Sequence, residues 1–180
     1  MGAPTLVGDT IFLRALEPED IDMLYDIENR EEYWELSGTQ APYGRHLLQE
    51  YIANAYKDLY EAKQLRFVIC LRETQRVLGL VDLFDFSPRH FRAGVGILII
   101  EAEDRRHGYA LETLEILKAY AFKQLDLHQL YANILEENTA SQRLFEKVGF
   151  VLVGIKKDWR RLQGSYKNEL LYQLINIHVH

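Results

Sequence analysis

The residues best suited to chemistry lie in one stretch of the chain, from Val95 to Ala110. The run Val-Gly-Ile-Leu-Ile-Ile is short, apolar and β-branched, and a charged loop follows it, which is typical of a buried strand. Apolar residues then recur at helical spacing from Ala110 to Phe122. Between strand and helix, Arg105-x-x-Gly108-x-Ala110 places small residues where the unpaired N–H groups of a helix start point outward. The stretch therefore predicts a strand, a tight loop and a helix terminus that binds an anion, phosphate above all.

A second motif lies downstream, between Glu137 and Phe150. The first motif resembles the (Arg/Gln)-x-x-Gly-x-(Gly/Ala) acyl-CoA motif of the GNAT superfamily of N-acetyltransferases. The second is similar to the Asn-x-x-(Ser/Ala)…(Tyr/Phe)-x-x-x-Gly-Phe segment that follows the fifth strand in that superfamily. Both have the expected order and spacing, and the resemblance covers nearly the whole chain. Within the superfamily, the sequence resembles bacterial spermidine N-acetyltransferases and ribosomal-protein N-terminal acetyltransferases.

The resemblance implies an enzyme that uses acetyl-CoA as cosubstrate and acetylates a primary amine by direct attack in a ternary complex. Backbone amides from Arg106 to Ala110 and the side chains of Arg105 and Arg106 suit a pyrophosphate. Asn138 either caps the following helix or bonds the pantetheine arm, and the resemblance implies the second role as well. It also implies that the strand offers backbone N–H groups to the acyl arm. The predicted donor site comprises Leu98, Ile99, Ile100, Arg105, Arg106, His107, Gly108, Tyr109, Ala110, Asn138 and Phe145.

Attack on the thioester requires an uncharged amine, so a base must remove a proton from an amine whose pKa lies near about 10. Asp82 and Asp85 are three residues apart on a predicted strand, so they point to opposite faces and only one of them can face the cleft. Glu101 and Glu103 are further candidates. We expect the base to be Glu35 or Asp82.

The departing CoA thiolate can be protonated by a nearby acid. Spermidine enzymes of the superfamily carry a tyrosine seven positions after the motif's asparagine, whereas this chain has Phe145, which has no proton to give. Ser141 lies on the same helical face four residues earlier and is a possible donor. Phe145 also motivates an alternative hypothesis, a module that binds or senses acyl-CoA without turnover.

The acceptor is left open by the sequence: a polyamine such as spermidine, a protein N-terminus or another small amine. Tyr33-Trp34-Glu35 resembles the aromatic acceptor loop of spermidine enzymes, where aromatic faces and carboxylates suit an alkyl polycation. The acidic residues that follow in those enzymes are not reproduced by Leu36, Ser37 and Gly38.

Length and composition predict a single domain spanning residues 1–180. The formal charge of −6 argues against a general nucleic-acid binder. Because apolar runs are short and the first residues do not resemble a signal, we expect a cytoplasmic protein without a membrane segment. Cys70 is the single cysteine, and no Cys/His cluster has the spacing of a zinc site, so no metal is expected.

The expected architecture is α/β: a GNAT fold with a mixed central sheet of about seven strands and about four helices on both faces. A loop is expected from Arg30 to Gly44. The apolar final strand Glu169–Ile177 would need covering as a sheet edge, so we expect a homo-oligomer, a dimer at least. Strands are expected at 10–16, 66–72, 77–86, 92–100, 129–135, 150–159 and 165–177, and helices from 18 to about 28 and at 45–63, 110–125 and 138–147.

Overall fold

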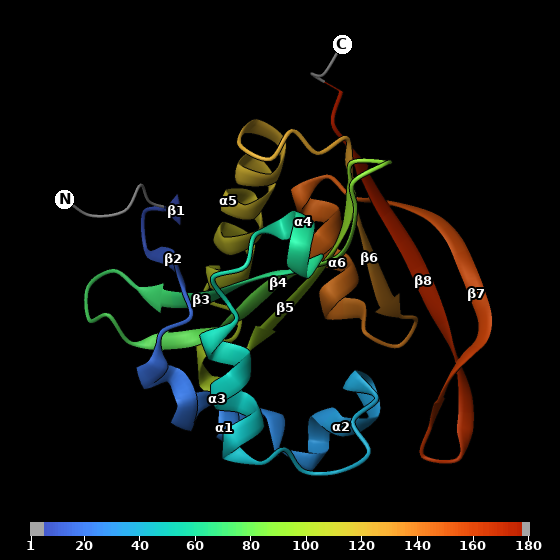
Figure 1. Cartoon of the computed structure of the whole chain (residues 1–180). Coiled ribbons are helices and arrows are strands. Elements are labelled where there is room, and N and C mark those ends of the chain that lie inside the picture. Colours follow the sequence, from blue (N-terminus) through green and yellow to red (C-terminus); the bar gives the residue numbers. More distant parts are fainter. Residues whose placement is uncertain (1–5, 178–180) are drawn as a thin grey trace.

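The computed structural model describes residues 6–177, whose eight strands form one mixed sheet (Figure 1). The strands follow the order β1-β2-β3-β4-β5-β6-β8-β7, and the one parallel pair is β5 with β6. Their bounds are β1 (Leu6–Val7), β2 (Ile11–Ala15), β3 (Leu65–Leu71), β4 (Val77–Ser87), β5 (Arg92–Ile99), β6 (Gln129–Leu135), β7 (Val151–Leu162) and β8 (Ser165–Ile175).

Helices cover both faces of the sheet. One core cluster joins the sheet to α5 and α6 through residues such as Leu117 and Phe145, and a second joins it to α1 and α3 through Leu24 and Leu48. In Figure 1, α1, α2 and α3 gather at the bottom and α5 lies at the top. The helices are α1 (Ile21–Glu28), α2 (Glu31–Ser37), α3 (Arg45–Ala53), α4 (Leu59–Ala62), α5 (Tyr109–Lys123) and α6 (Thr139–Val148), with 3-10 turns η1 (Pro18–Asp20) and η2 (Ala102–Asp104).

The predicted α/β fold with a mixed sheet is confirmed, with eight strands and six α-helices in the described residues instead of about seven and four. The extra strand is β1, whose two residues pair with β2 and give too short a pattern to recognise. Within residues 6–177, no helix combines the length and the apolar character needed to cross a membrane.

The loop predicted from Arg30 to Gly44 is wrong over its first half, which forms α2. Tertiary contacts stabilise this short helix, because the Trp34 indole donates to the Glu28 carbonyl at 3.0 Å. Gly38 ends the helix in the left-handed conformation, with φ of 76°. Seven residues without a clear apolar period do not predict a helix by themselves.

The single helix predicted at 45–63 is also wrong, because two helices, α3 and α4, occupy the segment. The Asn54 side chain donates to the Glu50 carbonyl at the end of α3. The Asp58 carboxylate then accepts from the Glu61 amide at 2.9 Å and begins α4. Short polar side chains that bond to nearby backbone therefore interrupt a continuous apolar stripe.

The prediction that the final strand forms a sheet edge is wrong as well. β8 lies between β6 and β7, and β7 is the edge. The first half of β7 exposes apolar side chains, with Val151 62% and Val153 49% exposed. A strand edge of this kind is a potential surface for pairing with another chain.

Candidate active site

The sheet opens between β5 and β6. The two strands pair only through Arg92–Gly94 and Gln129–Tyr131, although β5 continues to Ile99 and β6 to Leu135. Residues 95–99 are therefore paired with β4 on one side and have no partner in β6 on the other. Backbone groups without a strand partner can bond an extended polar ligand instead.

A cavity of about 830 Å³ adjoins this opening. Its walls are the end of β5 (Ile97–Ile99), the loop and start of α5 (residues 104–106 and 108–111), one side of α6 with its cap (from Asn138 to Lys147) and Tyr33 of α2. The size is that of a site for a substantial small molecule. Both motifs found in the sequence therefore meet at one cavity.

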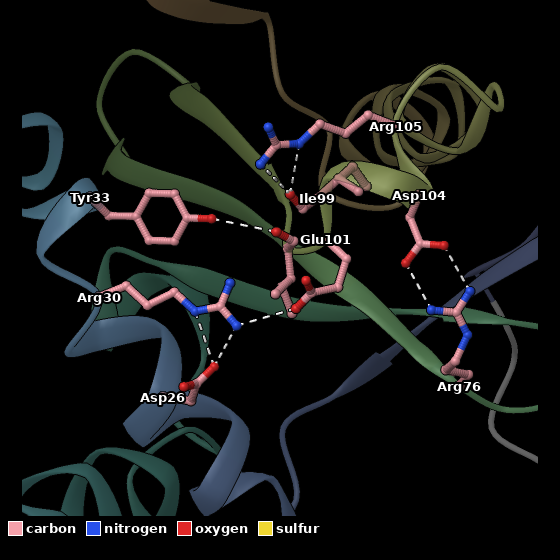
Figure 2. Close-up of polar contacts among 9 residues, drawn as sticks. Asp26, Arg30, Tyr33, Arg76, Ile99, Glu101, Asp104 and Arg105 are labelled. Carbon is pink, nitrogen blue, oxygen red and sulfur yellow. Dashed lines mark hydrogen bonds and ion pairs between the residues drawn. The ribbon is translucent and has the colours of Figure 1, made fainter.

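The loop before α5, predicted to bind an anion, forms one end of the cavity. Arg106 and Gly108 take the left-handed conformation, with φ of 66° and 84°, and α5 begins at Tyr109. The Asp104 carboxylate accepts two hydrogen bonds from Arg76 at 2.7 and 2.8 Å (Figure 2), and these bonds lower the pKa of Asp104. The loop is thereby fixed to the turn between β3 and β4, and the first residues of α5 line the cavity.

The two arginines of this loop are placed differently. The Arg105 guanidinium donates to the Ile99 carbonyl at 3.3 and 3.4 Å, so its side chain braces the loop against β5 (Figure 2). Arg106 is exposed on the cavity rim. The His107 and Tyr109 rings stack with their centroids 5.6 Å apart. Of the two arginines predicted to hold a pyrophosphate, Arg106 is therefore the one whose side chain is more accessible to a ligand.

Asn138 and Ser141 lie together at the start of α6. The Asn138 side-chain oxygen accepts from the Ser141 amide at 3.1 Å, so the capping role is present. Both residues also line the cavity. The capping bond uses the oxygen of Asn138, and its side-chain nitrogen is a separate donor that a ligand can use.

Phe145 lies in the core and not on the described cavity wall. Its side chain is 4% exposed and packs edge-to-face with Phe150, with ring centroids 5.0 Å apart. α6 is amphipathic, so the turn that carries Ser141 faces the cavity while Phe145 points beneath it. The predicted contact of Phe145 with the donor stays a prediction.

Neither of the two carboxylates predicted as bases is among the described residues of the cavity wall. Both oxygens of Asp82, on β4, accept from Arg66 at 2.7 and 2.8 Å. Glu35, on α2, accepts from the Gln163 amide at the tip of the β7–β8 hairpin, at 3.2 Å.

Two features of the site could not be predicted from the sequence: one ion pair, and the position of Tyr33 on the wall of the donor cavity. Arg76 and Asp104 are 28 residues apart and belong to no recognisable motif. Tyr33, predicted within an acceptor loop, lines the same cavity as the donor motifs. Within residues 6–177, no group of three or more His, Cys, Asp or Glu side chains is placed to hold a metal ion.

A mixed sheet whose parallel pair separates next to a glycine-containing helix start and a cavity is compatible with an acyltransferase that holds a long donor. The family model described as "Acetyltransferase (GNAT) domain" matches residues 10–151, and the chain belongs to this family. The predicted recognition and the predicted enzyme class, an N-acetyltransferase, are confirmed.

Relatives and solved structures agree with this assignment. The spermidine N(1)-acetyltransferase of Vibrio cholerae is 28% identical over 166 residues, covering 90% of this chain and 91% of that protein. The uncharacterized N-acetyltransferase YoaA of Bacillus subtilis is 25% identical over 175 residues, covering 96% of this chain and 97% of that protein. The crystal structure of the V. cholerae spermidine N-acetyltransferase in complex with CoA and spermine has a TM-score of 0.79 at 25% identity, covering 92% of this chain and 95% of that one. A putative ribosomal-protein-serine acetyltransferase from V. cholerae shares the fold, with a TM-score of 0.72 at 21% identity and coverage of 96% and 97%.

Proposed function

We propose that the protein transfers the acetyl group of acetyl-CoA to a primary amine, by direct attack in a ternary complex. The observation that carries the proposal is the single cavity shared by the helix start of α5, the unpaired edge of β5 and the start of α6. The α5 start would bind the pyrophosphate. Of the amides predicted along the acyl arm at Leu98–Ile100, the Ile100 amide already donates to the Leu78 carbonyl at 2.9 Å, so the Ile99 amide is the one proposed to face the arm. Fixed N–H donors stabilise the negative charge that develops on the thioester oxygen.

The proposed acceptor is a polyamine such as spermidine, or alternatively a protein N-terminus. The face of the sheet that carries α1 and α3 holds Arg66 between two carboxylates, Asp82 at 2.7 Å and Glu28 at 3.3 Å. Two acids on one guanidinium leave one negative charge in excess, which favours a cationic acceptor. The spermidine acetyltransferases among the relatives support the same choice.

Glu35 and Asp82 remain the proposed bases for the acceptor amine. Asp82 is held by two bonds from a buried guanidinium, so it would act through water or by orienting the acceptor. Glu35 is exposed on α2 and makes one contact with the hairpin tip through its side chain. We further propose a homo-oligomer and a cytoplasmic location.

The test is thiol release from acetyl-CoA at about pH 8 with and without spermidine, alongside calorimetric binding of CoA. Release that depends on spermidine supports the polyamine acceptor, and release only with peptides that begin in small residues supports the N-terminal one. CoA binding without release for either acceptor class would contradict the proposal and favour a binding module. Glu35→Gln and Asp82→Asn then separate the two candidate bases, since loss of kcat at unchanged CoA affinity identifies the residue that handles the acceptor.

A further inference from the structure

Tyr33 reaches the donor cavity from the face of the sheet that carries α1 and α3. Among the described residues that line the cavity, Tyr33 is the only one that precedes β5 in the sequence. Its ring packs with the core cluster of α1 and α3, as do Leu98 and Ile100 of the β5 end. The helices α5 and α6 belong to the cluster on the other face of the sheet. Tyr33 therefore lies where the cavity passes from the donor face of the sheet toward the α1/α3 face.

This position is the expected meeting point of the two substrates. A donor bound at the α5 start and along β5 occupies the α5/α6 side, so an acceptor has to approach from the α1/α3 side. The acyl carbon and the sulfur must then lie between them, close to the end of β5. From the geometry we propose that the Tyr33 hydroxyl donates a proton to the departing CoA thiolate, an inference that rests on the proposed function.

The hydroxyl is held loosely enough to change its partner. It lies 3.5 Å from the Ile100 carbonyl, at the outer limit of a hydrogen bond (Figure 2). Four charged groups surround this end of β5: Asp26 on α1, Arg30 before α2, Glu101 after β5 and Arg105 in the loop.

Arg30 is the charged group that interacts with the Tyr33 hydroxyl. Its guanidinium pairs with Asp26 at 2.6 Å and Glu101 at 3.2 Å, and so ties α1 to the end of β5. Hydrogen bonds to Asp26, Glu101 and, as a smaller contribution, the Tyr33 hydroxyl raise the pKa of Arg30. Two carboxylates on this one guanidinium leave one negative charge in excess, so Arg30 orders the end of β5 without supplying a net positive charge to the phenolate.

The proposed transfer step is balanced in protons and electrons and needs no further reagent. The amine nitrogen forms the C–N bond, and collapse of the tetrahedral intermediate breaks the C–S bond, with its electron pair leaving on sulfur. Tyr33 gives its phenolic proton to that sulfur, and the proton lost from the attacking nitrogen returns to the phenolate through water. The products are the amide and the CoA thiol, and the enzyme is restored.

Phe145 and Ser141 are less suitable than Tyr33 as proton donors to the thiolate. Phe145 has no proton and lies in the core. Ser141 lines the cavity, but an aliphatic alcohol is a far weaker acid than a phenol, whose pKa is about 10. General-acid assistance is worth about 10²–10⁴-fold in rate.

The test compares Tyr33→Phe, Ser141→Ala and the wild-type protein for kcat, acetyl-CoA affinity and melting temperature. Tyr33→Phe is expected to lower kcat by about 10²-fold or more while CoA affinity changes less than a few-fold. Tyr25→Phe is the matched control, because this exposed phenol on α1 stacks under Arg45 and does not line the cavity. It is expected to keep the wild-type kcat.

A second measurement separates proton donation from a structural role. Replacing Tyr33 with a fluorinated tyrosine, whose phenol is more acidic, should move the high-pH fall of kcat to lower pH, and Tyr33→Phe should abolish that fall. A wild-type kcat in Tyr33→Phe, an unmoved pH profile or a larger loss in Ser141→Ala would overturn the inference and leave the proposed function standing. A wild-type protein that releases no thiol with any amine would overturn both.

Discussion

Gly108 offers a direct test of how the loop before α5 holds the donor. Its φ is +84°, and a Cβ added there would meet no protein atom within 4 Å. Because Gly108 lines the cavity, that open space is the space the donor would occupy. The change Gly108→Ala should therefore affect folding and donor binding by different amounts.

The cost to folding follows from the backbone alone. A left-handed conformation costs a non-glycine residue about 1–2 kcal/mol, and the lower entropy of the unfolded alanine chain offsets about 0.4–1 kcal/mol. We expect the free energy of unfolding to fall by about 0–1.6 kcal/mol. In the complex, the methyl group would also displace the phosphate from one charge-assisted hydrogen bond, worth about 1.5–3 kcal/mol. Since about 1.4 kcal/mol is tenfold, acetyl-CoA affinity should fall about 10- to 150-fold.

Gly164 provides the matched control. It lies in the turn between β7 and β8, with φ of +79° and likewise no atom within 4 Å of an added Cβ. Gly164→Ala should lower the free energy of unfolding by the same amount and leave the acetyl-CoA dissociation constant unchanged. Urea unfolding and calorimetric titration measure the two quantities. Equal CoA affinities in the two variants would refute the assignment of this loop as the phosphate site.

Three further predictions concern stability and assembly. Thr113 is 0% exposed and its hydroxyl has no hydrogen-bond partner in the described structure, so Thr113→Val should raise the free energy of unfolding by about 1 kcal/mol in urea titration, and a loss would contradict this. Burial opposes ionisation of Asp20, but hydrogen bonds from Arg14 and from the Glu17 amide outweigh it and lower its pKa. The ionised Asp20 therefore stabilises the folded protein fully above the unfolded-state pKa of about 3.9, and this stabilisation is lost as the pH falls through the lower folded-state pKa. The free energy of unfolding of Asp20→Asn should accordingly change less than that of the wild-type protein between about pH 5 and pH 2. Parallel pH dependences of the two proteins would contradict the assignment. The exposed apolar edge of β7 should be covered in a homo-oligomer, and light scattering that finds a monomer at micromolar concentration would contradict this.

The sequence alone is sufficient to predict the elements that carry the proposed donor site. The strand, the loop with Gly108 and the helix that follows are consecutive in the chain, and their patterns depend on local backbone preferences and on apolar periodicity. Such patterns require no knowledge of distant neighbours. The elements β5, β6 and α5 accordingly begin and end within a few residues of their predicted bounds.

The placement of the residues proposed to handle the acceptor depends on tertiary structure. Tyr33 meets the Ile100 carbonyl across 67 residues, and Asp82 is held by Arg66, 16 residues away on a neighbouring strand. α2 is fixed by contacts with the end of α1, the end of β5 and the hairpin tip, so its own short sequence does not specify a helix. Which strand forms the sheet edge likewise depends on β8 inserting between β6 and β7. The local backbone conformation depends on neighbouring residues in the sequence, whereas the partner of a side chain across the sheet depends on how the whole chain packs.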